Sequence, residues 1–251
     1  MIRIPIFLFL RLFVFISLFT CAALAETSPE EILRKSDEIR LPSKDYTMLA
    51  RVTSSKPGAE PKIGIYEVMS KGKERSVIKT LAPPTDKDRI LLMREDNLWA
   101  YLPNISKPLR ISLRDRLLGE VANADIARAN FVGDYTATIA GSEKISGANY
   151  SILDLTAKTN SVTYAKVKLW VEASSFKPLK AEFFGVSGRI LKSCTYERYS
   201  MLGGRSRPTR IVMNDPIIKG QHSIIEYAKM ELKPLPDKYF TDDYMKKLSA
   251  K

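Results

Sequence analysis

The stretch that decides the fold is 81–135, LAPPTDKDRILLMREDNLWAYLPNISKPLRISLRDRLLGEVANADIARANFVGDY. It holds two short apolar runs, 89–93 and 97–102, separated by charged turn residues, and a third run, 109–113, follows a proline-bounded turn. Such runs predict antiparallel strands. Residues 114–130 contain no proline and space their apolar side chains as one or two short helices do. A hairpin followed by a helical segment predicts a sheet with a cover above an apolar groove.

The flanking sequence predicts one helix and then strands. Ser28 and Glu31 form a capping-box pattern around Pro29, so a helix begins there and ends before Pro42. From residue 46 the apolar residues alternate with a period of two, as in antiparallel strands with one wet face. The pattern returns after residue 135, continues to residue 232, and is followed by a short helix at 240–248. We expect a mainly β (α+β) fold, one large curved antiparallel sheet of about eleven strands.

Residues 1–25 have the features of a secretory signal peptide. Arg3 and Arg11 are their only charges, and Ala23-Leu24-Ala25 fits a cleavage site after Ala25. A membrane anchor is the alternative, but Arg11 interrupts the apolar run. A lipoprotein signal ending at Cys21 is a second alternative, which fits poorly because no small residue directly precedes the cysteine. We expect residues 26–251 to form one exported domain in the periplasm.

The residue inventory argues against an enzyme. The mature chain holds one cysteine, Cys194, and one histidine, His222, which cannot build a Cys/His metal site or an internal disulfide. The sequence has no nucleophile elbow, phosphate-binding loop or dinucleotide fingerprint. We expect no catalytic residue, no metal and no cofactor. A hydrolase that uses two distant carboxylates on envelope glycan or lipid remains an open but unsupported alternative.

The chain is strongly basic, with a formal net charge of +12. Basic runs lie at 110–116 and 205–210. In an exported protein such runs meet anionic lipid head groups rather than nucleic acid, so we expect no nucleic-acid partner. The alternative is a solvated charged face without a partner.

The wide sheet offers apolar side chains that can line a groove. A curved sheet of this width does not fill its own concave face, so helices or a ligand must do so. An ordinary packed core under the helices is the alternative. The expected lining residues are Leu92, Leu98, Ala100, Leu102, Val167, Leu169, Val171, Leu179, Phe183 and Met213.

Several motifs resemble the LolA-like superfamily of outer-membrane lipoprotein-sorting proteins, in particular its uncharacterised branch. An aromatic-rich strand ending in Leu-Pro, 98–103, precedes the basic strand 107–111, as in that family. Gly119, Asp125 and the pair Asp134-Tyr135 resemble the segment that follows. Later, Trp170-Val171 and Pro178-Leu179-Lys180 resemble a strand and a Pro-Leu-Lys hairpin. The resemblance spans most of the mature chain, and none of its motifs is catalytic.

The resemblance implies an unclosed β-barrel whose mouth is covered by helices and whose hollow holds acyl chains. It implies a monomeric periplasmic carrier of lipid or acylated lipoprotein, working with an inner-membrane transporter and an outer-membrane acceptor. The alternative is a binding module that senses such ligands and signals to a partner protein. The residues expected to form the cover or contact a head group are Arg110, Arg114, Arg116, Leu117, Leu118 and Ile126.

Overall fold

The structure is a computed structural model that describes residues 27–103 and 105–249. The predicted signal peptide, residues 1–25, lies outside the described residues, as does Cys21. None of the helices in the described part of the chain is long and apolar enough to span a bilayer.

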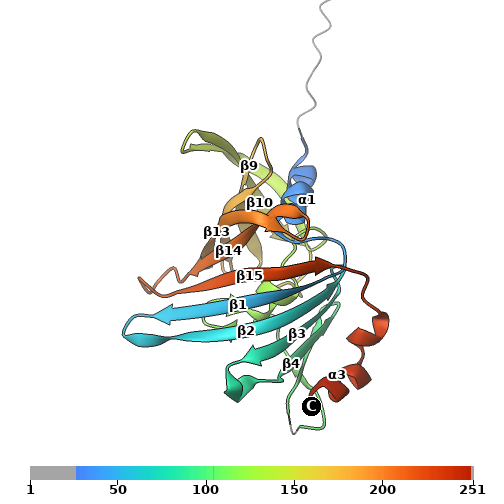
Figure 1. The fold of residues 1–251 in the computed structure, drawn as a ribbon. Coiled ribbons are helices and arrows are strands. Elements are labelled where there is room, and N and C mark those ends of the chain that lie inside the picture. Colours follow the sequence, from blue (N-terminus) through green and yellow to red (C-terminus); the bar gives the residue numbers. More distant parts are fainter. Residues whose placement is uncertain (1–26, 104, 250–251) are drawn as a thin grey trace, which may run out of the picture.

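One antiparallel sheet of thirteen strands dominates the fold (Figure 1). The order is β6-β5-β4-β3-β2-β1-β15-β14-β13-β12-β11-β10-β9, and within the described chain the outer strands β6 and β9 do not pair with each other. The expected large, curved, unclosed antiparallel sheet is therefore confirmed, while the expected number of about eleven strands is too low. The strands are β1 (Tyr46–Lys56), β2 (Ala59–Lys71), β3 (Arg75–Ala82), β4 (Ile90–Arg94), β5 (Asn97–Tyr101), β6 (Leu109–Ile111), β9 (Tyr135–Ile145), β10 (Ala148–Ala157), β11 (Lys166–Glu172), β12 (Pro178–Phe184), β13 (Ile190–Leu202), β14 (Arg205–Asn214) and β15 (His222–Leu232).

Alternating side chains give the sheet a buried concave face. On β1, Tyr46, Met48, Ala50 and Val52 are all buried, and the residues between them are more exposed. This is the predicted period of two, because successive side chains of a strand point to opposite faces. Strands from near the two ends of the chain pair in the centre of the sheet. There β1 pairs with β15, and Tyr46 lies opposite Leu232.

Helix α1 (Pro29–Arg40) begins and ends as the sequence predicts. The Ser28 hydroxyl accepts a hydrogen bond from the backbone N–H of Glu31 at 3.2 Å, and Pro29 occupies the first turn. The helix ends at Arg40, two residues before Pro42. It packs on β9 and β14, and it buries Asp37 and Arg40 as well as its apolar face.

The segment expected to be mainly helical, 114–130, contains little helix. It forms a small hairpin of β7 (Arg116–Leu118) and β8 (Val121–Ala122), followed by the five-residue helix α2 (Asn123–Ala127). The hairpin turns at Gly119, whose φ of 57° suits a residue without a Cβ. A Cβ at this position would lie 2.1 Å from the Ser54 hydroxyl, so glycine lets the hairpin lie directly on the sheet.

A second core lies on the convex face under the C-terminal helix. Helix α3 (Asp242–Ser249) follows the 3₁₀ turn η2 (Asp237–Phe240) and packs on β4 and β5 (Figure 1). A further 3₁₀ turn, η1 (Pro84–Asp86), connects β3 to β4. Leu92 is buried in this second core with Phe240 and Met245. The expectation that Leu92 lines the concave groove is therefore wrong, because its neighbours Leu91 and Met93 take the concave face.

Candidate functional site

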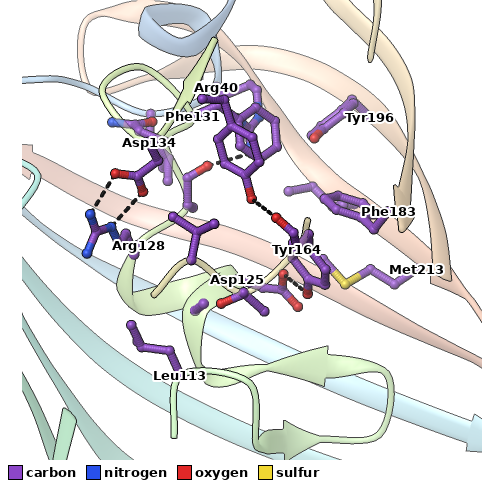
Figure 2. A pocket seen from close by; sticks show the side chains of 18 of the residues that line it. Arg40, Leu113, Asp125, Arg128, Phe131, Asp134, Tyr164, Phe183, Tyr196 and Met213 are labelled. Carbon is purple, nitrogen blue, oxygen red and sulfur yellow. Dashed lines mark hydrogen bonds and ion pairs between the residues drawn. The ribbon is translucent and has the colours of Figure 1, made fainter. Parts of the chain in front are cut away.

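The concave face of the sheet contains a narrow hollow with mainly apolar walls and a few charged residues, which we call the inner hollow. Residues 113–135, which we call the cover segment, close it from one side, and β12 to β15 form its floor (Figure 2). Its free volume is about 40 Å³, enough for only one or a few water molecules. The lining residues are Arg40, Leu41, Leu113, Ala124, Asp125, Arg128, Ala129, Asn130, Phe131, Asp134, Tyr135, Val162, Thr163, Tyr164, Phe183, Tyr196, Ile211, Met213 and Tyr227.

A buried ion pair ties α2 of the cover segment to the sheet. The Lys192 ammonium on β13 pairs with the Asp125 carboxylate, and each side chain exposes only 5 % of its surface. Lys192 also donates to the Glu120 carbonyl at 3.1 Å, and the Tyr164 hydroxyl donates to Asp125 at 2.8 Å. Burial raises the pKa of the Tyr164 phenol well above its usual value, and the Asp125 charge raises it further. Tyr164 therefore stays a neutral donor to the carboxylate.

A second set of contacts ties the cover segment to α1. The Asp37 carboxylate accepts the backbone N–H groups of Phe131 and Val132, both at 2.6 Å. Arg40 donates to Asp37 at 2.8 Å and to the Ala129 carbonyl at 2.6 Å, with its guanidinium 4.0 Å from the Phe131 ring centroid. Burial raises the pKa of the Asp37 carboxyl, and the Arg40 charge and the two amide donors oppose that rise.

A third set of polar contacts lies at the rim of the cover segment. Arg128 donates two hydrogen bonds of 2.6 Å to the Asp134 carboxylate, and Figure 2 shows this pair on the side of the hollow away from Phe183 and Met213. Arg128 also donates to the Glu95 carbonyl at 3.0 Å. All three sets hold the cover segment by polar contacts, while its apolar side chains face the sheet.

A larger hollow, which we call the outer hollow, lies on the other side of the β7–β8 hairpin. Its volume is about 420 Å³, within the range of roughly 300–1,000 Å³ that is common for ligand sites. Strands β2 and β3, the turn after β3 and the hairpin form its walls. The lining residues are Lys62, Ile63, Tyr66, Thr80, Pro83, Thr85, Asp86, Arg89, Leu117 and Leu118.

The structure places the expected groove residues in different parts of the molecule. Phe183 and Met213 line the inner hollow. Leu98, Ala100, Val167, Leu169 and Val171 are buried in the same concave core but not at the hollow. Leu102 and Leu179 are only half-buried, and Leu92 lies in the second core.

The expected cover residues also lie in different places. Ile126 is buried in the concave core, and Leu117 and Leu118 line the outer hollow. Arg114 donates to the carbonyls of Asn160 and Val162 at 2.6 and 2.9 Å, which fastens the start of the cover segment. Arg116 lies 3.5 Å from Glu120. Arg110 lies on the edge strand β6 and donates to Asn97, and it lines neither hollow.

The buried charges Asp37, Arg40 and Lys192 are not among the residues that the sequence predicts for the site. A signal for Lys192 was present, because it shares the strand parity of the buried Cys194 and Tyr196. Burial raises the pKa of the Cys194 thiol to about 11, so this thiol is protonated at neutral pH. Within residues 27–103 and 105–249 no group of three His, Cys, Asp or Glu side chains is arranged to hold a metal.

Comparisons with known proteins identify similar chains. A family model described as an uncharacterized protein matches residues 72–247. The crystal structure of the LolA superfamily protein NE2245 from Nitrosomonas europaea is 43% identical over 87% of this chain and 100% of its own, with a TM-score of 0.84. A search of curated proteins found no match.

Two more distant structures share the fold. A DUF1329 family protein from Desulfovibrio piger is 22% identical over 87% of this chain and 100% of its own, with a TM-score of 0.75. A domain from Vibrio parahaemolyticus, provisionally named as an outer membrane lipoprotein-sorting protein, is 18% identical over 87% of this chain and 98% of its own, with a TM-score of 0.73.

Proposed function

Because the chain belongs to the LolA superfamily, we propose that it is a non-enzymatic carrier of lipid or acylated lipoprotein in the periplasm. Residues 1–25 direct its export and are removed after Ala25. The mature chain works as a monomer and takes its cargo from an inner-membrane transporter to an outer-membrane acceptor. The Vibrio domain, which shares the fold, is named for outer membrane lipoprotein sorting, and this agrees with the proposed cargo.

The observation that carries the proposal is the construction of the cover segment. Its polar contacts to α1 and β13 lie around an apolar space that has almost no free volume. An acyl chain therefore enters only when the cover segment moves and its apolar side chains leave the concave face. Each buried CH₂ of the chain then contributes about 0.8 kcal/mol, which offsets the apolar contacts that the cover segment loses.

Native mass spectrometry tests the proposal. The protein is purified from the periplasm without detergent, its mass is measured, and an organic extract is analysed. We expect lipid or acylated protein to co-purify. A clean mass of the protein alone, with no uptake of added lipid or lipopeptide, contradicts the proposal.

A matched pair of variants on one strand locates the cargo. Met213→Lys places a cation in the inner hollow and should abolish loading, whereas Val212→Lys places it on the opposite, half-buried face of β14 and should not. Circular dichroism checks that both variants are folded. Equal loading of the two variants would place the cargo elsewhere.

Transfer to acceptor vesicles separates a carrier from a sensor. A carrier passes labelled cargo to vesicles, and a sensor retains it until a partner protein binds. Loss of intact cargo with appearance of hydrolysis products would indicate the hydrolase instead.

A further inference from the structure

The outer hollow has both polar and apolar walls. Lys62 and Arg89 contribute cations, and Tyr66, Thr80 and Thr85 contribute hydroxyl groups. Ile63 and Pro83 form an apolar wall together with Leu117 and Leu118 of the hairpin. This composition matches a ligand with a polar and an apolar part.

The cations of the outer hollow are not paired. The ion pairs formed within the described ranges include neither Lys62 nor Arg89, although Asp86 also lines the space. The Arg89 Nε is buried without a hydrogen-bond partner among those residues. Such an unpaired donor is costly, and since the hydrogen bonds and ion pairs of the described ranges do not include the Arg89 side chain, its guanidinium is available to a ligand with acceptor oxygens.

Nearby cations are already occupied. Lys79 lies 3.1 Å from Asp88, the residue next to Arg89, and Arg94 pairs with Asp242 at 3.1 Å. Lys79 and Arg94 are therefore occupied by carboxylates of this chain, whereas Lys62 and Arg89 remain available to a ligand in the outer hollow.

The position of Tyr66 depends on a glycine. A Cβ at Gly64 would lie 2.3 Å from the Tyr66 hydroxyl and 2.7 Å from its ring, so only glycine lets the ring lie across β2. Burial raises the pKa of Tyr66 to about 12, and the phenol stays protonated and able to donate at neutral pH. The Tyr66 hydroxyl therefore adds a neutral donor beside the two cations.

The charges of the outer hollow fit a singly charged anion. Lys62 and Arg89 carry two positive charges and Asp86 one negative charge, which leaves one positive charge in excess. Guanidinium and ammonium groups are the usual partners of phosphate oxygens. A phosphodiester carries one negative charge and has acceptor oxygens for Arg89, Lys62 and Tyr66.

The hairpin connects this site to the concave core. Leu117 and Leu118 line the outer hollow and also pack against the main core. Movement of the hairpin would therefore open a path from the outer hollow to the apolar concave face. A ligand with its head group at Arg89 has its apolar part at the start of that path.

We propose that the outer hollow binds the phosphodiester of a phospholipid head group while the acyl chains pass beneath the β7–β8 hairpin. This rests on the proposed carrier function and deepens it, because it selects phospholipid as the cargo class. Acylated lipoprotein lacks this phosphodiester.

Titration calorimetry on the mature chain tests the head-group site. The probes are monomeric dihexanoyl phosphatidylglycerol, dihexanoylglycerol with the same tails but no phosphate, and glycerol 3-phosphate with no tails. We expect phosphatidylglycerol to bind most tightly. Loss of a hydrogen bond to a charged group costs roughly tenfold or more in affinity, so Arg89→Gln and Lys62→Gln should each weaken phosphatidylglycerol by about that factor and leave dihexanoylglycerol unchanged.

Arg51→Gln is the matched control, because it removes one positive charge from an exposed position on β1 outside the outer hollow. It should leave binding unchanged. The proposal is overturned if Arg89→Gln and Lys62→Gln behave like Arg51→Gln, or if dihexanoylglycerol binds wild type as tightly as phosphatidylglycerol. It is also overturned if glycerol 3-phosphate binds as tightly as the lipid, which would indicate a site for free phosphate.

The two proposals can fail separately. Lys62→Gln changes an exposed side chain and keeps the test valid if Arg89→Gln does not fold. If long-chain cargo never loads but phosphatidylglycerol binding depends on Arg89, the carrier proposal fails and the head-group site stands. If Met213→Lys abolishes loading but the Arg89 and Lys62 variants bind normally, the carrier stands and the head-group site fails.

Discussion

The Asp125 carboxylate and the Lys192 ammonium form an ion pair that is almost fully removed from solvent, with one partner on the cover segment and the other on the sheet. Removing one partner of such a pair leaves an uncompensated buried charge and costs about 3–5 kcal/mol. We therefore expect Lys192→Met to lower the free energy of unfolding by about 3 kcal/mol, measured by urea denaturation. The double variant Asp125→Asn, Lys192→Met removes both charges and keeps an oxygen acceptor beside Tyr164, so it should recover most of that loss. A double variant as unstable as the single one would contradict a role for the ion pair.

Asp37 holds the backbone of the cover segment at Phe131 and Val132. Asp37→Asn removes the charge that pairs with the buried Arg40 and weakens both amide contacts. We expect faster hydrogen exchange at the amides of residues 129–132, measured by NMR or mass spectrometry. Glu31→Gln on the same helix breaks only the two exposed ion pairs with Arg34 and Lys35 and is the control, which should leave exchange in the cover segment unchanged. Equal exchange in both variants would show that Asp37 does not hold the cover segment.

Variants in the two cores should distinguish an effect on the free energy of unfolding from an effect on lipid loading. Leu92 is buried in the second core and Phe183 lines the inner hollow. Truncating either to alanine costs about 2–5 kcal/mol of stability. We expect Leu92→Ala to leave the lipid loading of the folded protein unchanged and Phe183→Ala to increase it, because the hollow becomes larger. Loading is measured by native mass spectrometry, and a loss of loading in Leu92→Ala alone would reverse the assignment.

Buried tyrosines predict a loss of stability at alkaline pH. Burial raises the pKa of Tyr46 and Tyr66 to about 12, whereas an unfolded tyrosine titrates at about 10. Above pH ~10 the unfolded state therefore binds fewer protons than the folded state, and the free energy of unfolding falls as the pH rises toward ~12. Urea denaturation from pH 9 to 12 measures the slope. Tyr66→Phe should have a shallower slope than wild type, and an identical slope would argue against the raised pKa of Tyr66.

The strands and α1 could be predicted because their signals are local. Ser28, Pro29 and Pro42 define the ends of α1, and the alternation of buried residues defines strands such as β1. The family could be predicted as well, since the motifs at 98–103 and 107–111 led to the superfamily that the Nitrosomonas structure supports.

The details of the site depend on contacts between distant residues. Asp37 and Arg40 have the spacing of a solvated helix pair, and only the nearby cover segment explains their burial. Residues 114–130 suit a helix locally, yet the contact of Gly119 with Ser54 and Ser223 favours the β7–β8 hairpin. Leu92 lies between two residues of the concave core, Leu91 and Met93. Its own side chain points to the other face of the sheet, where α3 covers it.

The pairing of β1 with β15 has a consequence for folding. These strands lie at opposite ends of the chain and next to each other in the centre of the sheet. Contacts between residues so far apart in sequence close large loops and slow folding. A chain that is synthesised from its N-terminus onward leaves β1 with an unpaired edge until residues 222–232 have also been made, and such an edge can pair with other chains. Aggregation is therefore expected to be greatest before the last strand arrives, and a chain truncated before His222 should aggregate rather than fold.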